Sequence, residues 1–199
     1  MGQDVHCGMP TLRETLRLRT AACHSALEAT PLMKAFASCD MSAEVLREYL
    51  SRQLALHDVM EPALRCWFDR DLADARLIKA DWLRHDLQAL GATASPFNVD
   101  WASPTTQAEA FGCLYVLEGA TLGLRTIARS LPEGHCALSS SGRFLSGYRE
   151  GTGVLWKDLI AILGTVETAA WPQAVEGARR TFDAYQAVFS GWRDERVSS

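Results

Sequence analysis

The stretch CLYVLEGATLGLRTIARSL, residues 113–131, decides the fold of this 199-residue chain. Its apolar residues recur every three or four positions, which is the period of one face of an α-helix. Gly119 and Gly123 lie inside the stretch, four positions apart and therefore on one helical face. Each glycine costs a helix about 0.5–1 kcal/mol relative to alanine. The pair therefore indicates either close packing against another helix or close approach of the backbone to a flat ligand.

The segments before and after this stretch also have helical periods. Helix boundaries are predicted by Thr11 with Glu14, which form a capping box, by Ser42 as an N-cap and by Gly91 as a C-cap. Turn-rich segments without a usable period separate the helices. The predicted helices cover residues 11–28, 42–68, 73–90, 105–131, 143–163 and 172–195, and Pro62 is expected to kink the second.

The chain shows neither an alternating β-branched run nor an internal repeat. We therefore predict one all-α domain of six to eight helices over residues 11–193. A flexible segment at residues 1–10 and a short tail at residues 194–199 are expected to flank it.

Composition limits the classes of function. A net charge of −4 gives no general electrostatic reason to expect nucleic-acid binding. No apolar run is long enough to span a membrane. The first ten residues lack the basic and apolar regions of a secretory signal, so we expect a cytoplasmic protein whose six cysteines are reduced. The absence of a C-x-x-C pair disfavours zinc binding.

His24 is a candidate iron ligand. It lies on the first predicted helix, beside an apolar stripe that includes Cys23 and Leu27. A lone histidine in such a place is more often a surface or core residue, although a neutral imidazole is a good ligand for haem iron. Arg17 lies seven residues earlier, about 10 Å along a continuous helix. A haem propionate would lie at roughly that reach from the iron.

Two further patterns have structural interpretations. The glycine-rich segment FLSGYREGTGVLWKDL, residues 144–159, predicts a turn into a helix, because no Gly-Lys-Ser/Thr sequence supports a phosphate-binding loop. The aromatic residues of the last helix form a single stripe, which is typical of a core: Phe182, Tyr185, Phe189 and Trp192.

Three segments in this order resemble the bacterial haem oxygenases, especially the type found beside bacteriophytochromes. They are LRLRTAACHSALE (residues 16–28), LYVLEGATLGLRTIARSL (residues 114–131) and the glycine-rich segment of residues 144–159. The resemblance runs from about Thr11 to Trp192, and the middle segment is the most specific of the three.

The resemblance implies an axial ligand and a distal helix. His24 matches the proximal haem ligand of the family. Gly119 and Gly123 match the distal helix, whose backbone lies over the haem. Glu118, which precedes the glycines, is assigned no catalytic role.

The resemblance also implies the residues around the porphyrin edge. Arg17, Tyr115 and Lys157 match positions that usually hold the haem propionates through charge-assisted hydrogen bonds. Phe182 and Phe189 would form walls of the pocket.

This chain departs from the family pattern at two positions. Leu124 stands where a second glycine is usual, and it would either narrow the distal pocket or face away from it. Ala161 stands where a second basic residue is common, one turn after Lys157. Without that basic residue, haem would be held less firmly or a different position of the ring would be attacked.

The implied activity is the cleavage of haem to biliverdin, CO and Fe²⁺, with haem as both substrate and cofactor. The reaction requires O₂ and electrons from an external reductase. A ferredoxin or flavin reductase would be the donor, docking near Arg125 and Arg129, and a bacteriophytochrome would be the acceptor of biliverdin.

Three alternatives stay open. A non-catalytic haem or bilin binding protein could use the same scaffold. A relative with the same fold could act on thiamin or as a di-iron oxidase, although the Glu-x-x-His motif of di-iron sites is absent. A purely structural bundle would leave His24 in solvent.

Overall fold

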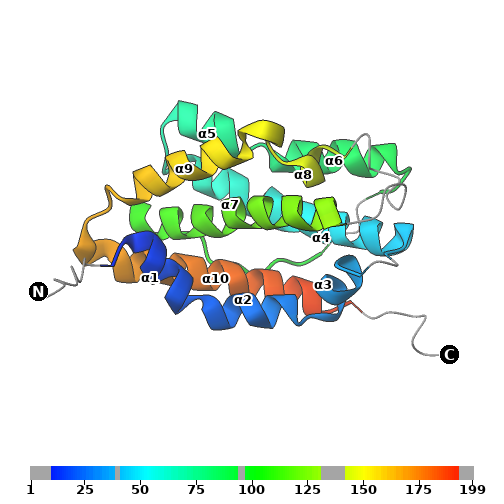
Figure 1. Cartoon of the computed structure of the whole chain (residues 1–199), viewed down its shortest axis with the longest axis horizontal. Helices are drawn as coiled ribbons and strands as arrows, with labels where there is room; N and C mark the ends of the chain where they lie inside the picture. The colour runs from blue at the N-terminus through cyan, green and yellow to red at the C-terminus, as the bar shows by residue number, and fades with distance from the viewer. Residues whose placement is uncertain (1–9, 39–40, 94–96, 131–141, 193–199) are drawn as a thin grey trace, which may run out of the picture.

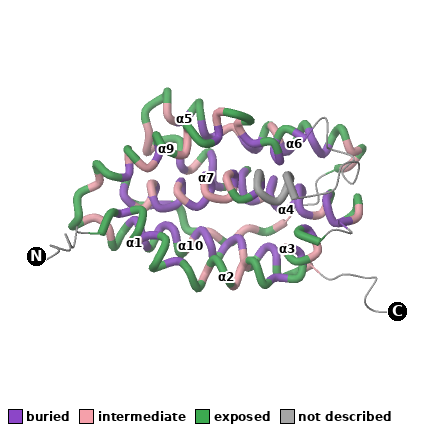
Figure 2. Tube along the Cα trace, in the orientation of Figure 1, coloured by how far each residue is buried: buried purple, intermediate pink, exposed green. Residues whose placement is uncertain are grey.

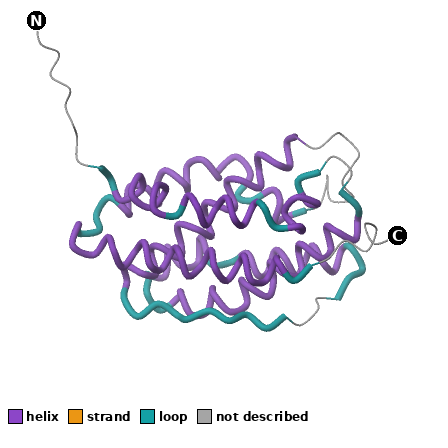
Figure 3. Tube along the Cα trace, turned by 90° about the horizontal axis from the view of Figure 1, so that it is seen from below, coloured by secondary structure: helices purple, strands orange, loops and turns teal. Residues whose placement is uncertain are grey.

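The computed structural model describes residues 10–38, 41–93, 97–130 and 142–192. These residues form ten α-helices and two 3₁₀ turns, with no strand among them, which confirms the predicted all-α class (Figure 3). The helices are α1 (Leu12–Arg19), α2 (Ala21–Glu28), α3 (Pro31–Phe36), α4 (Ala43–Arg65), α5 (Arg70–Arg76), α6 (Lys79–Ala89), α7 (Gln107–Ser130), α8 (Arg143–Ser146), α9 (Thr152–Leu163) and α10 (Trp171–Ser190), with 3₁₀ turns η1 (Arg149–Gly151) and η2 (Thr168–Ala170).

Helix α7, which carries the glycine pair, runs through the middle of the molecule (Figure 1). Helices α1, α2, α3 and α10 lie on one side of it, and α5, α6, α8 and α9 lie on the other. The largest helix contact joins α7 to α10, and α4 packs against α6. Buried residues face inward along these helices (Figure 2).

The predicted helix ends are confirmed where a side chain or a glycine defines them. Thr11 and Glu14 form the expected capping box, with the Glu14 amide donating to Thr11 Oγ1 over 3.2 Å. Ser42 caps α4 in the same way. Gly91 has a φ of +63°, the left-handed conformation that favours glycine after a helix.

Three predicted helices are broken in the structure. The predicted helix 11–28 is α1 and α2, interrupted at Thr20, whose hydroxyl donates to the Leu16 carbonyl over 2.8 Å. The predicted helix 73–90 is α5 and α6, separated at Leu77 and Ile78. The predicted helix 143–163 is α8 and α9, separated by the turn at Gly147 and Tyr148 and by η1. These breaks, together with α3, which was not predicted, raise the number of helices in the described residues above the predicted six to eight.

A glycine pair other than the predicted one brings α7 and α10 together. A Cβ atom at Gly112 would lie 1.8 Å from the Ala174 carbonyl oxygen, and one at Gly177 would lie 2.1 Å from the Glu109 carbonyl oxygen. Only glycine fits at such distances. Gly112 and Gly177 therefore allow the backbones of α7 and α10 to approach closely.

Several sequence predictions concern residues outside this description. The flexible segment at 1–10 and the tail at 194–199 fall almost wholly on residues 1–9 and 193–199, so the domain boundaries stay predictions. Cys23, Cys66 and Cys113 are free thiols, while the other three cysteines lie outside the described residues. Among the described residues, every helix is too short or too polar to span a bilayer.

Candidate functional site

A cavity of about 510 Å³ lies between the first helices of the chain, α7 and α10. Its lining is mostly apolar, with a few polar groups, as in small-molecule sites. The cavity brings together all but one of the predicted site residues: Arg17, His24, Tyr115, Gly119, Gly123, Phe182 and Phe189.

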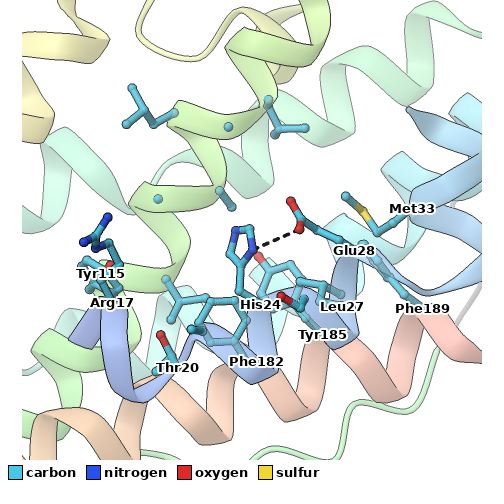
Figure 4. A pocket seen from close by; sticks show the side chains of 18 of the residues that line it. Arg17, Thr20, His24, Leu27, Glu28, Met33, Tyr115, Phe182, Tyr185 and Phe189 are labelled. Carbon is cyan, nitrogen blue, oxygen red and sulfur yellow. Dashed lines mark ion pairs between the residues drawn. The ribbon is translucent and has the colours of Figure 1, made fainter. Parts of the chain in front are cut away.

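His24 projects from α2 toward α7 (Figure 4). Its Nδ1 atom lies 3.4 Å from Glu28 Oε2, one helical turn further along α2, and 59% of its side chain is exposed because it faces the open cavity. The Phe182 ring meets the imidazole edge-on, with 5.9 Å between the ring centroids. A carboxylate beside Nδ1 favours a proton on that nitrogen and leaves Nε2 free to bind a metal.

Gly119 and Gly123 line the cavity from α7. A Cβ atom at Gly123 would meet nothing within 4 Å, and one at Gly119 would meet only the Trp156 ring, at 3.8 Å. Close packing against another helix therefore does not explain this pair. The missing side chains instead leave a bare stretch of backbone facing the cavity.

A basic edge borders one end of the cavity. Arg17 and Tyr115 lie together there, away from Glu28 and Met33 (Figure 4). Burial raises the pKa of Tyr115, and the positive charges of Arg13 and Arg17 oppose that rise. Arg13, which the sequence analysis missed, therefore adds a second positive charge near this end; its position one turn before Arg17 was the available signal.

Comparisons with known proteins identify the family of the chain. A search of curated protein sequences finds no match. The sequence profile of the family described as heme oxygenase matches residues 10–191. The chain belongs to the heme oxygenase family.

Solved structures have the same fold as this haem oxygenase family member. The NO- and CO-bound heme oxygenase of Neisseria meningitidis is 22% identical, with a TM-score of 0.73 over 94% of this chain and 96% of that one. The heme oxygenase of Leptospira interrogans is 16% identical, with a TM-score of 0.70 over 92% and 100%. Heme oxygenase-2 of Synechocystis sp. PCC 6803, in complex with heme and NO, is 21% identical, with a TM-score of 0.61 over 90% and 84%.

The residues around the cavity of this haem oxygenase family member fit a haem. His24 offers a nitrogen ligand on one side, and the Gly119–Gly123 backbone offers a flat face on the other. Phe182 and Phe189 are buried and line the cavity with apolar surface, while their role as walls of a haem pocket stays a prediction from the resemblance. Arg17 supplies a positive charge at one end for a carboxylate.

The two departures from the family pattern have different surroundings. Leu124 is 4% exposed and belongs to the core while also lining the cavity, so it takes up space beside the glycine pair. Lys157 and Ala161 lie on exposed positions of α9, and neither lines the cavity. The structure therefore does not bring Lys157 together with the other predicted site residues, and its contact with a propionate stays a prediction.

Polar side chains of α4 form the inner end of the cavity, which the sequence analysis missed. Tyr49 and Gln53 line it, and Gln53 Nε2 donates to Tyr49 Oη over 2.8 Å. The Gln53 Oε1 atom is buried without a partner. A buried carbonyl oxygen of this kind is available to a ligand or to water.

His57, also on α4, joins this helix to α10 through a buried hydrogen-bonded chain. Its Nδ1 lies 2.8 Å from Glu61 Oε1, and its Nε2 lies 3.4 Å from the hydroxyl of Tyr185, which lines the cavity. The amides of Lys79 and Ala80 also donate to Glu61 Oε1. Burial acts to raise the pKa of Glu61, but His57, Lys79 and the Ala80 amide lower it on balance.

Proposed function

We propose that this protein is a haem oxygenase that cleaves haem to biliverdin, CO and Fe²⁺ in a reaction that consumes O₂ and electrons. The single observation that carries the proposal is the pairing across one cavity of an available imidazole, His24, with the side-chain-free Gly119–Gly123 backbone. Such an arrangement accepts a flat ligand whose iron needs one axial nitrogen.

The bound haem supplies the iron chemistry that activates O₂. The protein's own residues bind and orient it. Glu28 orients the His24 ring so that Nε2 faces the cavity, and Arg17 with Tyr115 holds the propionate edge. The apolar walls of Phe182 and Phe189 limit the access of water, and the bare backbone of α7 leaves room for a small diatomic ligand.

The proposal includes an external electron donor, for which a ferredoxin or flavin reductase is the expected class. The predicted docking residues Arg125 and Arg129 lie on α7, but their side chains are outside the described part of the structure. A bacteriophytochrome as biliverdin acceptor and a cytoplasmic location also stay predictions from the sequence.

Titration of the purified protein with hemin, followed by reductant in air, tests the proposal. An oxygenase gives a Soret band on binding, and that band is then replaced by biliverdin absorption. A persistent Soret band would instead identify a haem carrier, and the absence of any Soret shift on hemin addition would remove haem as the ligand.

A further inference from the structure

A buried ionic cluster lies behind the cavity, on α7, one residue before Gly119. Glu118 Oε1 accepts hydrogen bonds from Lys79 Nζ over 2.6 Å and from the Tyr148 hydroxyl over 2.8 Å, and Glu118 Oε2 accepts from an Arg76 nitrogen over 3.2 Å. The charged side chains of this cluster are at most 3% exposed. One carboxylate therefore joins α7 to α5, to α6 and to the turn before η1.

We propose that Glu118 is a positioning residue for the distal face of the site. Through Lys79 and Arg76 it fixes α7, and through Arg76 it fixes the α9 segment whose Trp156 packs on Gly119. This inference rests on the proposed haem site, and Glu118 itself does not line the cavity.

Arg76 transmits the position of Glu118 to α9. Its second terminal nitrogen donates to the Leu155 carbonyl over 2.9 Å. The next residue, Trp156, lines the cavity, where its ring would lie 3.8 Å from a Cβ at Gly119. The Trp156 ring also lies 5.7 Å from the Tyr115 ring, centroid to centroid. The cluster therefore sets the space between α7 and the aromatic wall beside it.

The charges in the cluster make this arrangement specific. Burial would lower the pKa of Lys79, but Glu118 raises it on balance, so the lysine stays charged. Burial raises the pKa of Tyr148 to about 12, so the tyrosine stays neutral and donates. Two buried cations thus depend on one carboxylate, and removal of that carboxylate leaves them unpaired.

Glu118→Gln tests the inference, because it removes the charge and keeps the volume. Glu109→Gln is the matched control. Glu109 lies on α7 as well, nine residues or about 14 Å before Glu118, and the substitution removes its ion pair with Arg180 of α10. We expect Glu118→Gln to weaken hemin binding about tenfold, to shift the visible spectrum of bound hemin, and to change the biliverdin isomer ratio. Glu109→Gln is expected to leave all three unchanged.

Arg76→Lys is a second variant, for use if Glu118→Gln does not fold. Arg76→Lys keeps a positive charge beside Glu118 but loses the hydrogen bond to the Leu155 carbonyl. The same three properties should therefore change, while the melting temperature should fall less than in Glu118→Gln. Combining Glu118→Gln with Trp156→Phe then measures transmission, since two residues on one path give less than the sum of their single effects.

Three results would overturn the inference. Wild-type hemin spectra and isomer ratios in both Glu118→Gln and Arg76→Lys would show that the cluster does not position the site. Equal effects in Glu109→Gln would reduce Glu118 to a general stabiliser, and strict additivity with Trp156→Phe would remove the path through α9. Failure of the wild type to bind hemin would count against the proposed function itself. The positioning role would still be tested in the apoprotein, by comparing the near-ultraviolet circular dichroism of Trp156 between the wild type and Glu118→Gln.

Discussion

His24 occupies a two-turn helix in which the acidic partner of its imidazole lies one turn away. His24→Ala removes the only histidine among the described residues that line the cavity with the glycine pair. We expect the bound hemin to lose its axial imidazole, which the visible spectrum detects, and added imidazole to restore it. His85→Ala, an exposed histidine on α6, is the control and should retain the wild-type spectrum. Wild-type axial ligation in His24→Ala would remove the proximal assignment.

Arg17 lines the cavity, whereas Arg19, two residues later on α1, does not. Arg17→Ala is expected to weaken hemin binding about fivefold, because one exposed charge-assisted hydrogen bond contributes about 1 kcal/mol. Arg19→Ala removes the same charge from the same helix and should leave the hemin dissociation constant unchanged. Equal dissociation constants for both variants would show that only net charge matters. The same titration of Lys157→Ala decides whether that exposed lysine reaches a propionate.

At the scale of the elements, the glycines of α7 separate into two kinds. Gly112→Ala forces a methyl group into the Ala174 carbonyl, so α7 and α10 must move apart, at a cost of about 3 kcal/mol in unfolding free energy. Gly123→Ala meets open space and should gain about 0.5–1 kcal/mol from helix propensity while hemin binding weakens. Thermal denaturation followed by circular dichroism compares the two. A melting temperature for Gly112→Ala equal to that of the wild type would contradict the close-packing interpretation.

Local sequence signals predict the helices that carry their own boundary chemistry. Thr11, Ser42 and Gly91 act through atoms of their own turn, and all three predictions are confirmed. The break at Thr20 was missed, because the apolar period continues across it while the hydroxyl bonds back to Leu16. Helix α3 was not predicted; it begins at Pro31, where a proline at the first position lacks only an amide that the helix does not use.

At the scale of the whole molecule, Glu61 links stability to pH. Its pKa in the folded protein lies below the ordinary value of 4.5. Its contribution is therefore fully present above about pH 4.5 and is lost as the pH falls through the folded-state pKa. We expect Glu61→Gln to be less stable than the wild type by about 1–3 kcal/mol at neutral pH, with the difference shrinking in acid.

Urea denaturation at about one-unit steps between about pH 3 and pH 7 measures the difference in unfolding free energy between Glu61→Gln and the wild type. Asp58→Asn changes an exposed carboxylate on the same helix, paired with Arg84, and should shift stability only slightly. A constant difference between Glu61→Gln and the wild type across the range would show that the carboxylate does not titrate with unfolding.

The candidate site was predictable to the extent that its residues lie on recognisable segments. His24 and Gly119 come from two segments that resemble the haem oxygenases, and Phe182 comes from the aromatic stripe of the last helix. The three residues meet at one cavity. The buried ionic cluster behind it was not predictable, because Glu118 meets Arg76, Lys79 and Tyr148 only after distant helices pack. Periodicity tells which face of a helix is buried but not which charge on another helix it will meet.

Helix α2 holds the histidine of the site, yet no residue of α2 is fully buried. A helix of eight residues is too short to persist alone in water, so its order comes from contacts with its neighbours, chiefly α10. A porphyrin bound against His24 would give this helix a further apolar surface to pack on and so stabilise it. Opening of the ring to a nonplanar product would remove that packing. Helix α2, which binds the substrate, would then become less ordered and allow the product to leave.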